Sequence, residues 1–244
     1  MNFLVYSALF VVLVAQRVSS YSTAATTNFE KYRTNFPSDF NVVAAGGWDN
    51  VKRLAVDPKS ELISSIVSSI QNEETLEDTK LNALLGLLHA QGKGFNSVMV
   101  DGDWIPIFSK QAKKSSKAQK IVSKTEKGGT NAYSNFLVNK LLFENINYTP
   151  RRNGMLKATV KYHPVAANFD KTTDGSIVLR RVSCDIVDAF FKYKRIPKIS
   201  FPFFKVKGGH LDFLYLDDDI RITRGNRGGL FVHLRPKYLE SLSI

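Results

Sequence analysis

The stretch of sequence that decides the fold runs from Leu211 to Leu234 and reads LDFLYLDDDIRITRGNRGGLFVHL. Four of its apolar residues share one parity along an extended chain, which predicts a strand with an apolar face: Leu214, Leu216, Ile220 and Ile222. Gly225 to Gly229 then offers residues that tolerate positive φ, as a tight turn requires. Leu230 to Leu234 alternates again. The pattern predicts a β-hairpin that carries three acids next to three arginines.

The segment from Tyr215 to Val232 resembles the C-terminal signature of the plastid lipid-associated proteins, also called fibrillins. That signature reads roughly Tyr-Leu-Asp-acid-Asp-aliphatic-Arg-Ile-Ser/Thr-Arg-Gly-Asp-x-Gly-x-aliphatic-Phe-Val. The chain departs from it at Asn226, where the family often has Asp. The resemblance extends roughly from Pro58 to Arg235 and implies a structural role for five signature residues: Asp217, Asp219, Arg221, Arg224 and Gly225.

The rest of the chain predicts a mainly β fold preceded by two helices. Asp57-Pro58 is typical of a helix N-terminus, and apolar residues recur at helical spacing up to about residue 91. Downstream, Leu156 to His163 alternates cleanly between apolar and polar residues. About seven or eight such strands with short turns indicate an antiparallel sheet, which closure into a barrel would protect. We therefore predict a lipocalin-like antiparallel β-barrel over residues 98–236, within a domain spanning 57–238.

A Gly-x-Trp motif opens the predicted barrel at Gly102 and Trp104 and resembles the opening motif of lipocalins. In lipocalins this tryptophan closes the bottom of the barrel beneath an arginine, and Arg224 or Arg235 is the expected partner here. A barrel of about eight strands holds one small ligand. Four residues are the candidates for lining such a cavity: Trp104, Phe108, Val160 and Tyr162.

The N-terminus predicts a two-part targeting leader. Phe3 to Ala15 is mostly apolar but short of the roughly 20 residues that span a membrane, and small residues precede a cleavage position after Ser20. Residues 1–20 therefore read as a signal peptide. Residues 21–56 read as a transit-peptide-like or linker segment, as in algae whose plastids have extra membranes. Plastid import rests on the family resemblance; the alternative is an ordinary secreted protein.

A net charge of +12 predicts attraction to anionic surfaces. Much of it lies in a lysine-rich segment that includes Lys110, Lys113, Lys114, Lys117 and Lys120. This segment is either a solvated loop, a docking element for an anionic membrane or plastoglobule surface, or a nucleic-acid contact. It lacks aromatic residues that would stack on bases, which makes nucleic acid an unlikely partner.

A second basic segment is interleaved with aromatic residues, which include Phe190, Phe191, Phe201, Phe203 and Phe204. Core packing is its ordinary interpretation. The alternative is a basic–aromatic loop at the barrel mouth that dips into lipid or gates a cavity.

Catalytic and metal chemistry find little support in the sequence. Consecutive strand residues point to alternate faces, so Asp217 and Asp219 can converge while Asp218 cannot, and Arg221 is expected to neutralise Asp219. The four histidines have no metal-ligand spacing. We expect no cofactor and no metal. The competing interpretation is an enzyme on a barrel scaffold that uses the acidic cluster.

The sequence thus predicts a non-enzymatic protein of thylakoids or plastoglobules that binds or organises apolar molecules. Carotenoids, quinones and fatty acids are the ligands that the family resemblance implies. The physical basis would be the removal of apolar surface from water, at about 25 cal/mol per Å².

Overall fold

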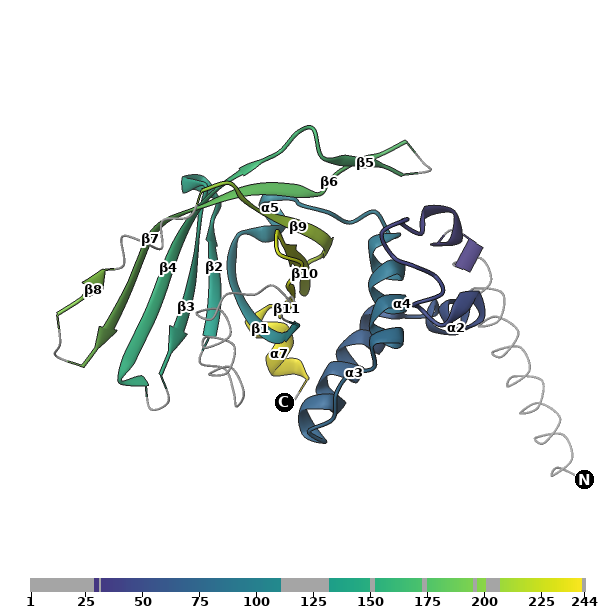
Figure 1. Cartoon of the computed structure of the whole chain (residues 1–244), viewed down its shortest axis with the longest axis horizontal. Helices are drawn as coiled ribbons and strands as arrows, with labels where there is room; N and C mark the ends of the chain where they lie inside the picture. Colours follow the sequence, from purple (N-terminus) through teal and green to yellow (C-terminus); the bar gives the residue numbers. More distant parts are fainter. Residues whose placement is uncertain are drawn as a thin grey trace, which may run out of the picture. The chain divides into compact units, whose positions relative to one another are not determined.

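The computed structural model describes residues 29–30, 32–110, 132–149, 152–172, 175–194, 197–200 and 207–242. The chain divides into two units, Met1–Gln91 and Gly92–Ile244. In the described residues, the first unit is helical and the second is built mainly from strands (Figure 1). Among these residues, no helix has both the length and the apolar character needed to span a membrane.

The described part of the N-terminal unit includes the helices α2 (Gly47–Leu54), α3 (Pro58–Gln71) and α4 (Asp78–His89). The predicted start of α3 is confirmed, because the Asp57 side chain accepts a hydrogen bond from the Ser60 amide at 3.1 Å. Lys80 of α4 pairs with Glu61 of α3. The helix α2 was not predicted, since its N-cap residue Gly46 offers no side-chain cap. It lies inside the segment 21–56, so part of that segment is helical.

The C-terminal unit is a sheet closed on itself. Its strands are β1 (Gly102–Lys110), β2 (Ala132–Leu137), β3 (Leu142–Tyr148), β4 (Gly154–Pro164), β5 (Phe169–Lys171), β6 (Ile177–Leu179), β7 (Arg181–Tyr193), β8 (Ile199–Ser200), β9 (Gly209–Leu216), β10 (Ile220–Gly225) and β11 (Leu230–Leu234). The order of the closed sheet is β4-β3-β2-β1-β11-β10-β9-β7-β8, and pairing of β4 with β7 closes the ring, while β5 and β6 form a separate two-stranded sheet. Every pairing is antiparallel, which confirms the predicted lipocalin-like, mainly β fold.

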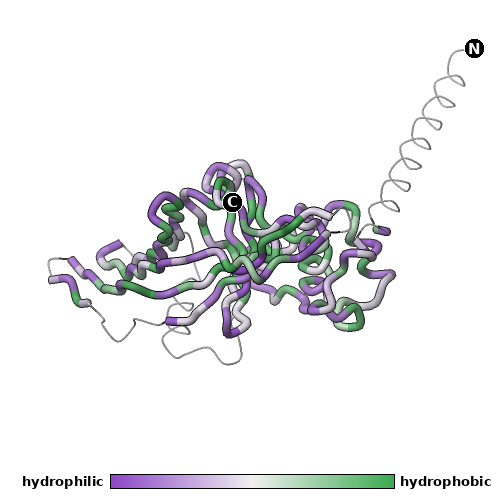
Figure 2. Tube along the Cα trace, turned by 90° about the horizontal axis from the view of Figure 1, so that it is seen from above, coloured by the Kyte–Doolittle hydropathy of each residue, from purple (hydrophilic) through white to green (hydrophobic). Residues whose placement is uncertain are grey.

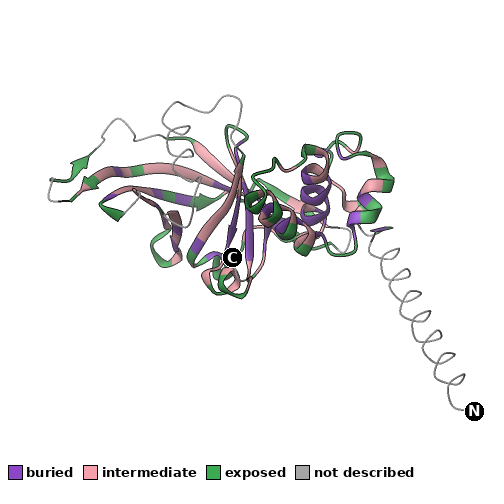
Figure 3. Cartoon of the chain, turned by 90° about the horizontal axis from the view of Figure 1, so that it is seen from below, coloured by how far each residue is buried: buried purple, intermediate pink, exposed green. Residues whose placement is uncertain are grey.

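The ring is closed tightly at one end and flares at the other. β7 pairs with β9 only over Arg181–Cys184, whereas it pairs with β4 from Val182 to Tyr193. Beyond Cys184, β7 therefore projects together with β4, β3 and β2, and β8 adds to its edge (Figure 1). Burial follows the same division, because the projecting strands are mostly half-buried or exposed, while the strands near the closed end contain the buried residues (Figure 3).

A short connection and a helix fill the closed end. Gly92–Asn96 crosses between strands, with the Phe95 amide donating to the Leu179 carbonyl at 2.7 Å and the Phe95 ring packing on Phe213. Val98 lies in the helix α5 (Ser97–Val100) rather than in the predicted strand. The fully buried core at this end comprises Val100, Trp104, Phe136, Phe143, Val160, Tyr162, Val182, Phe213 and Leu216.

The C-terminal stretch forms three strands rather than one hairpin. A turn at Asp217–Asp219 separates β9 from β10, and the predicted Gly225–Gly229 turn joins β10 to β11. The latter needs positive φ at Gly228, as predicted. The register between β10 and β9 shifts between Ile222 and Thr223, which leaves Leu214 as an extra, bulged residue of β9. The single alternation predicted across Leu211–Ile222 is therefore wrong, because the turn and the bulge each change the side of the sheet to which the following side chains point. After β11, the helix α7 (Pro236–Ser241) follows.

Candidate functional site

The acidic cluster is a structural turn. The Asp217 Oδ1 atom accepts hydrogen bonds from the Asp219 and Ile220 amides, both at 2.9 Å. The Tyr215 hydroxyl donates to the Asp217 Oδ2 atom at 2.8 Å, and Lys93 Nζ lies 3.2 Å from the same hydroxyl. Asp217 thus uses both carboxylate oxygens to hold its own turn. This favours the structural interpretation of the signature over an active site.

The Arg221 side chain does not form the expected ion pair with Asp219 of this turn. Its backbone pairs with His233 on β11 and its side chain points into the barrel, only 2% exposed. The guanidinium lies 4.7 Å from the centroid of the Phe136 ring and 5.2 Å from that of Trp104. Within the described part of the chain, no carboxylate forms an ion pair with it. The prediction that Arg221 neutralises Asp219 is therefore wrong, because the turn directs the Arg221 side chain inward.

Trp104 closes the bottom of the barrel, as the Gly-x-Trp motif predicts. Its Nε1 donates to the Val100 carbonyl at 2.8 Å. Arg235, not Arg224, is the stacking partner, with its guanidinium carbon 3.8 Å from the centroid of the Trp104 ring. Gly102 has φ of +88°, and a Cβ there would lie 3.4 Å from Arg235 Nη1, so this glycine suits both the turn and the arginine.

Three of the four candidate lining residues share the interior. Trp104, Val160 and Tyr162 belong to the buried core, and the Tyr162 ring packs on Phe136 at 5.5 Å. Phe108 is different: the register of β1 against β11 shifts between Pro106 and Phe108. This bulge places Phe108 opposite Val232, on the face away from Trp104. The prediction that Phe108 lines the interior is therefore wrong, since a bulge reverses the alternation.

Residue register arranges the interior of β2, β3, β4 and β7 in three rows. The row nearest the closed end is large and apolar: Phe136, Phe143, Val160 and Ile186. The middle row is small or polar: Ser134, Asn145, Ala158 and Ala189. The row nearest the projecting end mixes both: Ala132, Asn147, Leu156 and Phe191. Large side chains thus fill the closed end, and smaller ones line the barrel above it.

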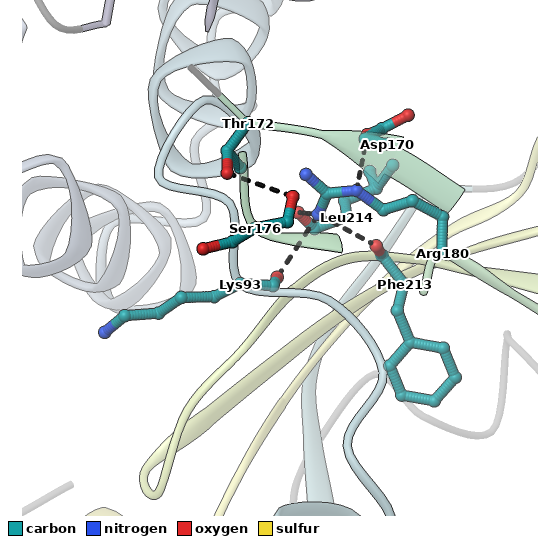
Figure 4. A network of polar contacts seen from close by, with 7 residues as sticks. All are labelled: Lys93, Asp170, Thr172, Ser176, Arg180, Phe213 and Leu214. Carbon is teal, nitrogen blue, oxygen red and sulfur yellow. Dashed lines mark hydrogen bonds and ion pairs between the residues drawn. The ribbon is translucent and has the colours of Figure 1, made fainter. Parts of the chain in front are cut away.

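Arg180 was not identified from the sequence and proves to be a structural clamp (Figure 4). Its Nε atom donates to Asp170 at 2.7 Å, and its Nη1 atom donates to the Lys93 and Leu214 carbonyls at 3.3 and 3.1 Å. Burial lowers the pKa of this guanidinium, while Asp170 opposes that shift. These contacts tie the β5–β6 excursion to the closed end. The partners of Arg180 lie far apart in the sequence, so no local sequence motif predicts these contacts.

The projecting end carries basic and aromatic side chains together. Lys198 lies 4.0 Å from the centroid of the Phe190 ring, Lys194 lies 5.5 Å from that of Tyr193, and Ile199 is 48% exposed. Hydrophilic stretches alternate with short hydrophobic ones here (Figure 2). We call the exposed Arg152, Lys192, Lys194, Lys198 and Ile199 the tip. Lys110 is exposed at the end of β1, whereas Lys113, Lys114, Lys117, Lys120 and Phe201 to Phe204 lie outside the described residues.

The remaining candidate reactive groups show no arrangement typical of a catalytic or metal site in the described residues. No three His, Cys, Asp or Glu side chains among the described residues converge as a metal site would require. Burial, with Asp185 nearby, raises the pKa of the Cys184 thiol to about 12, which keeps it protonated and unreactive at neutral pH. A pocket of 370 Å³ lies in the N-terminal unit, lined by residues that include Arg33, Phe36 and Trp48.

Comparison with known proteins identifies the barrel. A model of the family described as PAP_fibrillin matches residues 95–234, from the connection that closes the barrel to the end of β11. No curated protein and no solved structure matches the chain. The match does not include the helices α3 and α4, so the resemblance expected from Pro58 begins later, at residue 95. Since the match spans more than half of the 244 residues, the chain belongs to the PAP/fibrillin family of plastid lipid-associated proteins.

Proposed function

We propose that this protein binds apolar molecules such as carotenoids, quinones or fatty acids inside its barrel, at the surface of thylakoids or plastoglobules. The observation that carries the proposal is the ring of strands whose closed end is filled by large side chains while the next row of its inner wall is small or polar. An apolar ligand placed above Val160 and Tyr162 would be removed from water, at about 25 cal/mol per Å². The family is generally structural rather than enzymatic, in line with this role.

The tip supports contact between the barrel mouth and a lipid surface. Its Lys192 and Lys194 supply positive charge, since Lys198 is paired with Asp188 at 3.3 Å, and the neighbouring rings of Phe190 and Tyr193 supply apolar area. Each basic residue near an anionic surface contributes about 1 kcal/mol. Because the tip adjoins the flared half of the barrel, a ligand would pass between membrane and barrel without crossing bulk water.

Delivery to the plastid through a signal peptide over residues 1–20 followed by a transit segment remains part of this proposal. The family points to the plastid. The helix α2 lies within residues 21–56, so we infer that the folded part of the mature chain begins before residue 57.

Ligand binding is tested with a substitution whose side chain fills the proposed cavity. The full chain is incubated with vesicles that contain β-carotene or a prenylated quinone, and the pigment or quinone bound to the separated protein is measured. Ala158→Phe introduces a ring into the middle row of the interior, whereas Thr159→Phe introduces the same ring on the outer face.

The unchanged chain and Thr159→Phe are expected to take up ligand, and Ala158→Phe is expected to lose about tenfold in affinity, equivalent to roughly 1.4 kcal/mol. Circular dichroism and thermal unfolding establish that both variants are folded. An unchanged chain that takes up neither compound would refute the proposal, and so would equal uptake by the two variants.

A further inference from the structure

Within the part of the chain that the structure describes, several polar atoms inside the barrel have no hydrogen-bond partner. The atoms are Ser134 Oγ, Tyr162 Oη, Arg221 Nε and Nη1, and His233 Nδ1. All four residues are buried. Buried polar groups in folded proteins are almost always hydrogen-bonded, so such a group of unpartnered atoms needs an explanation.

These side chains lie in one part of the interior. Arg221 and His233 are directly paired across β10 and β11. The Phe136 ring lies 4.7 Å from the Arg221 guanidinium and 5.5 Å from the Tyr162 ring, which links the three side chains. Ser134 is paired with Trp104, whose ring also lies against Arg221. Arg221, His233 and Ser134 therefore lie around Trp104, whereas Tyr162 follows Val160 toward the closed end.

Arg221 is the most demanding member of this group. Burial, with Arg235 nearby, lowers the pKa of its guanidinium to about 9, so it remains charged at neutral pH. The rings of Trp104 and Phe136 attract the cation but do not offer the oxygen acceptors that its N–H groups require. A buried charge without a partner is costly, whereas a carboxylate matches the guanidinium with two parallel hydrogen bonds.

We propose that Arg221 receives the carboxylate of a long-chain carboxylic acid whose apolar tail lies along the small middle row toward the projecting end. The Ser134 hydroxyl group, on the residue paired with Trp104, is a further donor for the carboxylate oxygens. Ala158 and Ala189 leave room for the tail, because their side chains are among the smallest on the inner wall. This inference rests on the proposed function and specifies the ligand class: a fatty acid rather than an uncharged lipid.

The test compares two ligands with the same tail. Oleate and oleyl alcohol are titrated against the full chain at pH 8, with displacement of a fluorescent apolar probe as the readout. The unchanged chain is expected to bind oleate about tenfold more tightly than oleyl alcohol, as hydrogen bonds to charged groups predict. This comparison needs no substitution, so it holds even where a variant fails to fold.

A variant then assigns the difference to one residue. Arg221→Met replaces the guanidinium with an apolar side chain and is expected to bind oleate and oleyl alcohol equally. Arg221→Lys keeps a positive charge but not the planar fork, and is expected to keep part of the preference for oleate. Arg227→Met is the matched control, because Arg227 is exposed in the turn between β10 and β11. It is expected to keep the full preference for oleate.

The outcomes separate this inference from the function on which it rests. Equal binding of the two ligands by the unchanged chain would overturn the carboxylate site but leave apolar binding intact. A preference that persists in folded Arg221→Met would also overturn it. Failure of either ligand to bind would overturn the proposed function and the carboxylate site together.

Discussion

The guanidinium carbon of Arg235 lies 3.8 Å from the centroid of the Trp104 ring, so a residue that follows β11 covers the first fully buried residue of β1. Arg235 also donates to three backbone carbonyls, through Nη1 to Asp101 and Asp103 and through Nη2 to Met99. These carbonyls belong to α5, to Asp101 that follows it and to the start of β1. One side chain therefore joins the two ends of the barrel sequence at its closed end.

Arg235→Ala is expected to destabilise the chain by about 2–3 kcal/mol, the sum expected for a cation–π contact and several hydrogen bonds to carbonyls. Urea unfolding measures this change, followed by the tryptophan fluorescence to which Trp48 and Trp104 both contribute. Lys237→Ala, a nearby exposed substitution in α7, serves as the control and is expected to change stability by less than about 0.5 kcal/mol. Equal stability of the two variants would show that Arg235 does not clamp the barrel.

Asp217 and Asp218 offer a comparison of neighbouring carboxylates. Asp217→Ala removes the acceptor of two backbone amides and of the Tyr215 hydroxyl, so a loss of about 1–3 kcal/mol is expected. Asp217→Asn keeps an acceptor oxygen and is expected to lose less. Asp218→Ala changes an exposed residue and is expected to be nearly neutral. Thermal unfolding checks the order of the three.

The enzyme hypothesis predicts a different pattern for the same variants. Asp217→Asn would then abolish turnover with its fold retained, whereas a structural turn predicts loss of stability with ligand binding retained in the folded fraction. Retained uptake of apolar ligand by folded Asp217→Asn would support the structural turn. A loss of uptake without a loss of stability would contradict it.

Local patterns in the sequence predicted much of this structure. Asp57-Pro58 marks the start of α3 because capping depends on neighbouring residues, and the alternation over Leu156–His163 marks β4 because strand period is local. The Gly-x-Trp motif located Trp104 for the same reason. The family resemblance then supplied barrel closure, which alternation alone does not distinguish from an open sheet.

What the sequence did not reveal depends on pairing between distant segments. The shift in β1 that turns Phe108 outward appears only when β1 is paired with β11. Arg221 faces inward because of the turn between β9 and β10, and Arg180 binds carbonyls of Lys93 and Leu214, far from it in the chain. The prediction of which strand residues face the interior therefore failed where a turn or a bulge changes the alternation. For the same reason the sequence did not reveal the buried charge of Arg221.

The buried His233 predicts acid sensitivity. Burial, with Arg221 opposite, lowers the pKa of His233 well below its ordinary value, so the folded state keeps the imidazole neutral. An unfolded histidine has a pKa of about 6.5. The unfolded state therefore binds an extra proton below that pH, and stability falls as pH decreases, by up to about 1.4 kcal/mol per pH unit.

His233→Gln is expected to flatten the dependence of unfolding free energy on pH between about 6.5 and 5, because it removes this titrating group. His163→Gln, an exposed control, is expected to leave the slope unchanged. Urea midpoints measured at several pH values provide the comparison. A slope that is the same in wild type and His233→Gln would mean that His233 is not held neutral.

The tip provides the final prediction, which concerns membranes. Lys192→Gln with Lys194→Gln removes two exposed charges at the projecting end of β7, whereas Lys140→Gln with Lys161→Gln removes two exposed charges near the closed end of the same sheet. Both double variants change the net charge equally. The tip variant is expected to lose about 2 kcal/mol of binding to anionic vesicles, roughly 30-fold in affinity, and the control variant much less.

Co-sedimentation with vesicles that contain an anionic glycerolipid measures this difference, with neutral vesicles as the reference. Raising the salt concentration is expected to weaken wild-type binding more than that of the tip variant, because exposed charges are screened within about 8–10 Å at physiological ionic strength. Equal loss in the two double variants would mean that net charge alone attracts the protein. Docking through the mouth of the barrel requires instead that the position of the charge decide the affinity.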